Sequence, residues 1–253
     1  MHRFYLPDGP PADGPLLLPR HIARQLSRVL RMRPGDEIGV FDGSGIQWTV
    51  ELDEVTPRSA AGHVVDVTRP STESRVEITL YQSIIDAAPF ELVLQKGVEL
   101  GVTHFVPLLT DRVRGAGPTG ASGHRQARWA RIVQEAAEQS GRVCVPDVTS
   151  PVTLDAAFEA EAPPAVTLIV PWEGETSLSL RAVLRNPETR PVDAVRVLIG
   201  PKGGLTGSEI EFLRARGALI VTLGNRVLRS ETAAIATVSA ILYELGELGD
   251  TPS

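Results

Sequence analysis

The sequence predicts a two-domain α/β protein, in which a small β-rich domain precedes a larger domain built around a mostly parallel sheet. Short alternating or apolar runs separated by turn residues fill residues 1–70, a pattern typical of short strands. From residue 76 onward, apolar strand-like runs alternate with helical patterns, as expected of a parallel sheet flanked by helices. Two of these runs, at 195–199 and 218–223, lead directly into glycine-bearing loops.

Length and composition limit the classes of protein that this chain can represent. The chain has 253 residues, 42% of them hydrophobic, which is enough for two packed cores and argues against a disordered chain. The single cysteine, Cys144, excludes an internal disulfide and suits a reducing compartment. No apolar run approaches the roughly 20 residues that cross a bilayer, and the first residues do not resemble a signal peptide. We therefore expect a soluble, cytoplasmic protein with no membrane partner.

The first 70 residues are expected to form a small β-rich domain. Its predicted strands are residues 3–6, 37–41, 46–52 and 62–67. The sequence Asp-Gly-Ser-Gly at 42–45 predicts a hairpin turn between two of them. The polar stretch at 69–74, which contains a proline, is the expected boundary. This gives one domain at 1–70 and a second at 74–253.

A basic helix is predicted at residues 19–32, between the first two of those strands. Its arginines lie within about one quarter of the helical circumference, at 3.6 residues per turn, and they are Arg20, Arg24, Arg28 and Arg31. Four apolar residues fall on the opposite side: Ile22, Leu26, Val29 and Leu30. No acidic residue occurs between 20 and 33, although solvated charged faces normally mix both signs.

This stripe of arginines is expected to contact RNA phosphates, despite the formal net charge of -6, because local clustering matters more than total charge. A merely solvated surface remains the alternative. So does a general bias toward arginine, since only two of the 25 basic residues are lysines.

The second domain alternates strands and helices. Strands are predicted at 76–85, 104–109, 166–170, 195–199 and 218–223, and helices at 90–100, 125–139 and 231–248. The last helix carries an apolar stripe that suits a core face or a partner's helix, consisting of Ile235, Val238, Ile241, Leu242 and Leu245. The glycine-rich segment 115–123 lies among arginines; it is either an inert insertion or a segment that orders on RNA.

The two glycine-bearing loops are the strongest indication of a ligand site. In the first, glycines and a proline at 200–204 precede Thr206 and Glu209, a capping-box pattern that opens a helix. In the second, Gly224 interrupts the chain before an alanine-rich helix. Both loops are expected at the carboxyl ends of neighbouring parallel strands, where such sheets bind ligands. Neither the phosphate-loop nor the dinucleotide glycine pattern is present, and tight strand-to-helix connections remain the alternative.

At these loops the sequence closely resembles the RsmE family. The residues that carry the resemblance are Ile-Gly-Pro-Lys-Gly-Gly-Leu-Thr at 199–206, Leu-Gly-Asn-Arg-Val-Leu-Arg-Ser-Glu-Thr-Ala at 223–233, and the segments 95–102, 138–142 and 3–6. The family consists of S-adenosylmethionine-dependent enzymes that methylate uridine N3 in 16S ribosomal RNA. One departure is visible, because Lys202 stands where the family usually has Glu, and no role is transferred to that position.

The resemblance implies a fold, a cofactor and partners. It implies a SPOUT-type methyltransferase domain with a C-terminal trefoil knot, preceded by a PUA-like β-barrel that binds RNA. A knot cannot be inferred from periodicity, and knotted folds are rare. The cofactor is expected to be S-adenosylmethionine, and the partner 16S ribosomal RNA or the assembled small subunit. The resemblance further implies a homodimer, for which a monomer that buries the terminal helix in its own core is the alternative.

Site residues follow from matching motif positions. The expected cofactor-binding residues are Val170, Ile199, Gly200, Gly203, Gly204, Leu223, Gly224, Val227 and Leu228. The candidate catalytic residues are Arg229, Arg142 and Arg112, because a cation beside the uracil carbonyls would stabilise the anion formed at N3. A structural salt bridge is the alternative for each arginine. Glu138 and Glu231 are possible proton acceptors, although helix capping explains both. No metal-ligand spacing occurs, so no metal is expected.

Three other functions remain open. A non-catalytic RNA-binding protein would keep the arginine stripe without needing two glycine-bearing loops. A small-molecule enzyme that uses another nucleotide would keep the loops without the acid-free basic segments. A methyltransferase of the same fold could also act on another RNA.

Overall fold

The computed structural model describes residues 1–113, 123–159, 166–190 and 193–249. The chain forms two compact units. The first contains residues 1–73 and 137–145, and the second contains 74–136 and the chain from 146 onward. The predicted loop at 115–123 lies outside the described residues except for Gly123.

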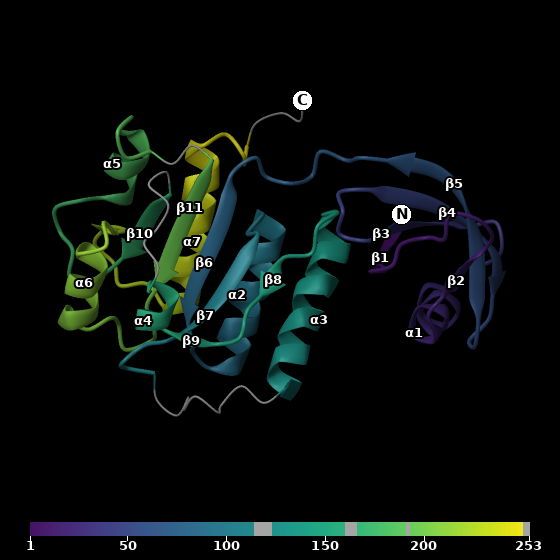
Figure 1. The fold of residues 1–253 in the computed structure, drawn as a ribbon, viewed down its shortest axis with the longest axis horizontal. Helices are drawn as coiled ribbons and strands as arrows, with labels where there is room; N and C mark the ends of the chain where they lie inside the picture. Colours follow the sequence, from purple (N-terminus) through teal and green to yellow (C-terminus); the bar gives the residue numbers. More distant parts are fainter. Residues whose placement is uncertain (114–122, 160–165, 191–192, 250–253) are drawn as a thin grey trace. The chain divides into compact units, whose positions relative to one another are not determined.

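The first unit is built on a five-stranded sheet (Figure 1). Its strands are β1 (His2–Tyr5), β2 (Leu16–Leu18), β3 (Glu37–Phe41), β4 (Gln47–Val55) and β5 (Ala60–Thr68), in the order β1-β3-β4-β5-β2. β1 pairs with β3 in parallel and the other pairs are antiparallel. The predicted hairpin between β3 and β4 is confirmed, and both of its glycines have positive φ, 91° at Gly43 and 86° at Gly45. β2 was not predicted, because three residues are too few to show a period.

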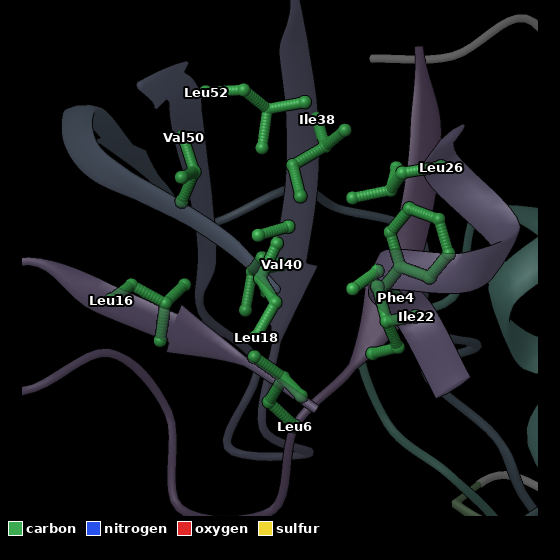
Figure 2. Close-up of a cluster of buried hydrophobic side chains, with 12 residues drawn as sticks. Phe4, Leu6, Leu16, Leu18, Ile22, Leu26, Ile38, Val40, Val50 and Leu52 are labelled. Carbon is green, nitrogen blue, oxygen red and sulfur yellow. The ribbon is translucent and has the colours of Figure 1, made fainter. Parts of the chain in front are cut away.

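The core of this unit lies between the curled sheet and one helical segment (Figure 2). Phe4 from β1 and Ile38 and Val40 from β3 meet Ile22 and Leu26 from the helical segment. All five side chains are at most 2% exposed. The apolar side predicted for residues 19–32 therefore does face the core at Ile22 and Leu26.

The second half of that helix differs from the prediction. A regular α-helix, α1, covers only Arg20–Arg24 and continues as a π-helical segment, η1, at Gln25–Leu30. Arg31 then adopts a left-handed conformation with φ 55°. Because a π-turn holds more residues than an α-turn, the helical wheel no longer applies, and Val29 is 71% exposed instead of buried.

The second unit is built on a seven-stranded, all-parallel sheet. Its strands are β6 (Glu77–Ser83), β7 (His104–Leu109), β8 (Asp147–Val148), β9 (Val152–Thr153), β10 (Thr167–Pro171), β11 (Ala194–Ile199) and β12 (Leu219–Val221). The order is β12-β10-β11-β6-β7-β8, with β9 also paired to β7. The prediction that β11 and β12 are neighbours is wrong, because β10 lies between them and pairs with both. Their loops nevertheless emerge at one edge.

Helices connect and cover this sheet. They are α2 (Ala87–Leu100), α3 (Gly123–Ser140), α4 (Leu154–Ala157), α5 (Leu180–Arg185), α6 (Gly207–Arg214) and α7 (Ser230–Glu244). α2 and α7 pack against each other on one face of the sheet (Figure 1). Gly101 ends α2 as predicted, with φ 105°. α7 is shorter than predicted, and only Val238, Ile241 and Leu242 of its apolar stripe are fully buried. The short elements β8, β9, α4 and α5 were not predicted.

None of the helices formed by the described residues has the length and apolar character required to cross a membrane.

Candidate functional site

A cavity of about 460 Å³ opens at the carboxyl edge of the parallel sheet. Its volume lies within the roughly 300–1,000 Å³ of small-molecule sites. Four segments form its wall: the loop after β11, the end of β10, the segment before α7 and the start of α2. The lining residues are Ile85, Asp86, Pro89, Pro171, Trp172, Glu173, 199–205, 227–231 and Ala233. The two glycine-bearing loops therefore meet around one cavity.

The first loop presents its backbone closely to this cavity. The Gly204 N–H donates to the Pro201 carbonyl at 2.9 Å, closing a tight turn in which Gly204 has φ 74°. A Cβ atom at Gly204 would overlap the Glu173 carboxylate. A Cβ at Gly200 would lie 3.1 Å from Leu205. Gly204 is favoured by its positive φ, and Gly200 by the close approach of Leu205.

The predicted capping box after this loop is confirmed. The Thr206 hydroxyl accepts a hydrogen bond from the Glu209 N–H at 3.2 Å, and the Glu209 carboxylate accepts one from the Thr206 N–H at 2.7 Å. Such caps stabilise a helix by about 1 kcal/mol. Glu209 as a whole is 5% exposed, and its carboxylate also accepts a hydrogen bond from the Asp111 N–H at 2.9 Å. Glu209 thus links α6 to the segment that follows β7.

The second loop lines a smaller adjoining cavity of about 80 Å³. Gly224 has φ 110°, and a Cβ built there meets no atom within 4 Å. Its N–H donates to the Thr222 hydroxyl at 3.2 Å. Leu223, Gly224, Val227 and Leu228 line this cavity, and Val227 and Leu228 also line the larger one. The two cavities are therefore contiguous.

The structure brings most of the expected cofactor-binding residues together. Those on the larger cavity are Ile199, Gly200, Gly203, Gly204, Val227 and Leu228, and Leu223 and Gly224 complete the smaller one. Val170 is different, because it is fully buried in the core cluster of this unit and lines neither cavity. The adjoining residues Pro171 and Trp172 reach the wall instead.

The three candidate arginines lie in different environments. Arg229 lines the larger cavity with 87% of its side chain exposed, and its Nη1 lies 4.0 Å from Glu231 Oε1. Arg112 donates to the Gly203 carbonyl of its own chain at 2.6 Å. The structure therefore holds Arg112 against the first loop.

Arg142 belongs to the first unit and is 4% exposed. Its guanidinium donates to Glu73 Oε2 at 2.9 and 2.6 Å, and Glu73 Oε1 accepts from the Val143 and Cys144 N–H groups at 3.0 and 3.2 Å. This geometry corresponds to the structural salt bridge held as the alternative for that residue. Glu138 likewise accepts from the Tyr5 N–H at 3.0 Å.

Sequence reasoning missed three polar residues on the larger cavity: Asp86, Glu173 and Ser230. Asp86 precedes α2, yet its side chain does not cap the helix. Glu173 follows β10 by two residues. Examining the acidic residues that immediately follow each predicted strand could have identified Glu173, because the carboxyl ends of parallel strands face the site.

The arginine stripe of the first unit is exposed throughout. Arg20, Arg24, Arg28 and Arg31 are all exposed, and none forms an ion pair with a described residue. Within the described part of the chain, no group of three or more His, Cys, Asp or Glu side chains could hold a metal ion.

Comparisons with protein-family models match both parts of the chain. Residues 72–242 match the RNA methyltransferase domain, and residues 21–65 match the RNA methyltransferase PUA domain. The chain is thus a two-domain protein of the RNA methyltransferase class. The fold-class prediction, an α/β methyltransferase domain of SPOUT type after a PUA-like domain, is confirmed.

Individual relatives define the family more closely. The ribosomal RNA small subunit methyltransferase E of Synechocystis sp. is 34% identical over 86% of this chain and 70% of its own length. The protein of that name from Bacillus subtilis is 29% identical, with 85% of each chain covered. The chain belongs to the ribosomal RNA small subunit methyltransferase E (RsmE) family, which confirms the resemblance in the sequence.

Solved structures agree with this assignment. The Neisseria gonorrhoeae ribosomal RNA small subunit methyltransferase E, bound to S-adenosyl methionine, has a TM-score of 0.82 and 34% identity, covering 96% of this chain and 97% of that one. A putative methyltransferase from Legionella pneumophila, in complex with the same cofactor, has a TM-score of 0.83 and 30% identity, covering 95% and 96%.

Proposed function

We propose that this protein is an S-adenosylmethionine-dependent enzyme that methylates N3 of a uridine in 16S ribosomal RNA. The observation that carries the proposal is the pair of contiguous cavities lined by the two glycine-bearing loops, in a domain that belongs to the RNA methyltransferase family. Residues 74–253 are the proposed catalytic domain and residues 1–70 the proposed RNA-binding domain. The proposed place of action is the cytoplasm.

The residues around the cavity fit this cofactor. Ile199, Leu205 and Leu228 give an apolar wall for an adenine ring, while exposed loop backbone offers hydrogen-bonding groups. Three carboxylates, Asp86, Glu173 and Glu231, line the same space together with Lys202 and Arg229. The carboxylates outnumber the cations, which suits a ligand that carries positive charge. When bound, S-adenosylmethionine supplies a methyl group already activated by its sulfonium.

The chain's own residues would prepare the uracil for attack. Uracil N3 must lose its proton before it becomes nucleophilic, and a cation beside the carbonyl oxygens favours that loss. Arg229 is the exposed guanidinium at the cavity and is the proposed group for this task. Glu231 also lines the cavity and is the proposed acceptor of the N3 proton. The loops would exclude water and align the two reactants.

A methylation assay on purified 16S RNA and on small subunits tests the proposal. Isotopically labelled methyl groups should appear on one uridine, and mass spectrometry with chemical standards should place them at N3. Arg229→Ala should retain cofactor affinity by calorimetry but lose methyl transfer, and Arg229→Lys should recover only part of it, because a point charge replaces a planar fork. Methylation of a different RNA alone, or no cofactor binding by the wild type, would overturn the assignment.

The exposed arginine stripe is the proposed RNA contact in the N-terminal domain. Its four guanidinium groups would neutralise phosphates without reading sequence. Comparing affinities for free 16S RNA and the assembled subunit would identify which of the two is the substrate.

We further propose a homodimer in which one chain's N-terminal domain presents RNA to the other chain's cavity. α7 offers a pairing surface, since Thr232 and Ala236 are exposed and Tyr243 is 68% exposed. Mixing Arg229→Ala protein with an Arg24→Ala, Arg28→Ala double variant tests this arrangement. In the mixed dimer one intact cavity would meet one intact RNA-binding domain, so activity should recover. No recovery would indicate that each RNA-binding domain presents RNA to the cavity of its own chain. A monomer by light scattering would reject the dimer.

A further inference from the structure

A buried polar relay connects the first glycine-bearing loop to the start of α7. The Ser230 hydroxyl donates to the Gly200 carbonyl at 2.7 Å. The Gln82 amide donates to that hydroxyl at 2.9 Å and to the Ser83 carbonyl at 2.9 Å. Gln82 is 1% exposed and Ser230 is 9% exposed. The relay therefore joins three segments: the end of β6, the loop after β11 and the first residue of α7.

The hydrogen-bonding capacity of these groups fixes the direction of the relay. An amide nitrogen has two protons, and here both are used, one on the Ser83 carbonyl and one on the Ser230 hydroxyl. A flipped Gln82 amide would place its oxygen against the Ser83 carbonyl, acceptor against acceptor, so the network selects this orientation. Because the hydroxyl oxygen of Ser230 accepts from Gln82, its single proton is directed at Gly200.

The receiving peptide depends on this contact. The next residue after Gly200 is Pro201, so the peptide between them has no N–H and its carbonyl is its only polar group. Ser230 follows Arg229 directly, and Arg229 occupies the N-cap of α7 without capping it by its side chain. The hydrogen bond from Ser230 thus ties the orientation of the Gly200 peptide to the position of the second loop.

We propose that Ser230, oriented by Gln82, is a positioning residue that fixes the spacing of the two loops and thereby sets the affinity for the cofactor. This inference rests on the proposed function, since both loops line the cavity assigned to S-adenosylmethionine. Ser230 borders the larger cavity but Gln82 does not, so the Gln82 variant tests positioning apart from direct contact. Among the described residues, Gln82 Oε1 has no hydrogen-bond partner although it is buried, which makes the amide costly in this place. The two hydrogen bonds that the amide donates offset that cost.

Calorimetric titration of purified variants with S-adenosylmethionine tests the proposal. Ser230→Ala should weaken cofactor binding about tenfold or more, the scale expected when a buried carbonyl loses its donor. Ser230→Thr, which keeps the hydroxyl, should stay within about threefold of wild type on the same scale. Gln82→Met should give a smaller loss than Ser230→Ala, because the hydroxyl remains but is no longer oriented. The double variant should bind no more weakly than Ser230→Ala, since the two residues act in series.

Thr237→Val provides a matched control on the same helix. Its hydroxyl is also buried, at 0% exposure, but has no hydrogen-bond partner in the part of the chain that the structure describes. It should leave cofactor affinity unchanged. RNA affinity should be unchanged in every variant, and KM for the cofactor should rise more than kcat falls.

Two results would refute the inference while leaving the proposed function intact. One is wild-type cofactor affinity in folded Ser230→Ala protein. The other is an affinity loss in Thr237→Val equal to that in Ser230→Ala, which would show that general destabilisation of the fold explains the loss of cofactor affinity. Absence of cofactor binding by the wild type, in contrast, would refute the proposed function itself.

Discussion

Replacing Gly224 by alanine separates the backbone requirement of the second loop from its role in binding. Gly224 has φ 110° and lines the smaller cavity. A Cβ built there meets no atom of the described residues within 4 Å, its chain neighbours aside, so the new methyl group fits against the described protein. Because Gly224 lines the cavity, the methyl group would reduce the space left for the proposed cofactor.

Two free-energy terms are expected from this change. A non-glycine residue at positive φ costs about 1–2 kcal/mol of folding stability, which lowers Tm by roughly 2–4 °C per kcal/mol in a domain of this size. Crowding of a bound ligand by one methyl group costs about 1–3 kcal/mol more. At 1.4 kcal/mol per factor of ten, the second term weakens cofactor binding roughly 5- to 150-fold. Gly224→Val should abolish measurable binding while leaving the fold largely intact.

Gly217→Ala is the control for backbone strain. Gly217 has φ 80° and also has open space around a built Cβ, but it follows α6 and lines neither cavity. Both alanine variants should therefore lose similar stability in thermal melts, and only Gly224→Ala should lose affinity in a calorimetric titration. Equal cofactor affinity in folded Gly224→Ala and Gly217→Ala proteins would refute the assignment of this loop to the cofactor site.

Three further predictions concern the rest of the molecule. Arg24→Ala and Arg28→Ala should each weaken RNA binding for every sequence tested, with cofactor affinity constant. Each should also reduce the slope of log binding constant against log salt concentration by about one unit. Equal slopes for the wild type and the double variant would mean that the arginine stripe is only solvated. Arg142→Ala should destabilise the protein by about 1–3 kcal/mol in urea unfolding, because Glu73 loses the guanidinium but keeps its two backbone N–H donors. Unchanged unfolding with lost activity would instead favour a catalytic role. Hydrogen bonds from the Ser177 hydroxyl and from backbone N–H groups lower the pKa of Glu175 from 4.5 to about 2. The ionised carboxylate therefore stabilises the folded state fully above pH 4.5, and this contribution is lost as the pH falls toward 2. Glu175→Gln should make the stability to acid unfolding less dependent on pH in that window.

Local patterns were sufficient where the physical cause of the structure is local. The hairpin after β3, the end of α2 at Gly101 and the capping box at Thr206 were predicted because each depends on residues within one turn. The family resemblance supplied the fold class and pointed to both glycine-bearing loops together. It did not supply the partners of individual side chains.

The misses share a non-local cause. Nothing in the run at 166–170 indicates that β10 lies between β11 and β12, because strand order depends on the whole sheet. The π-turn at Gln25–Leu30 inserts a residue that a 3.6-residue period cannot reveal. Arg142 was a candidate catalytic residue by its motif position, yet its ion-pair partner Glu73 is 69 positions away in the chain. Sequence spacing alone gave no means of pairing the two.

The position of β10 between β11 and β12 has a consequence for ligand selectivity. The chain that leaves this strand, Pro171 to Glu173, forms part of the wall of both cavities, and the ring of Trp172 lies where a Cβ on Gly174 would stand. One short stretch therefore borders both parts of the combined space. If the cofactor fills that space as proposed, substitutions at these three residues would alter the fit of the ligand in both parts at once.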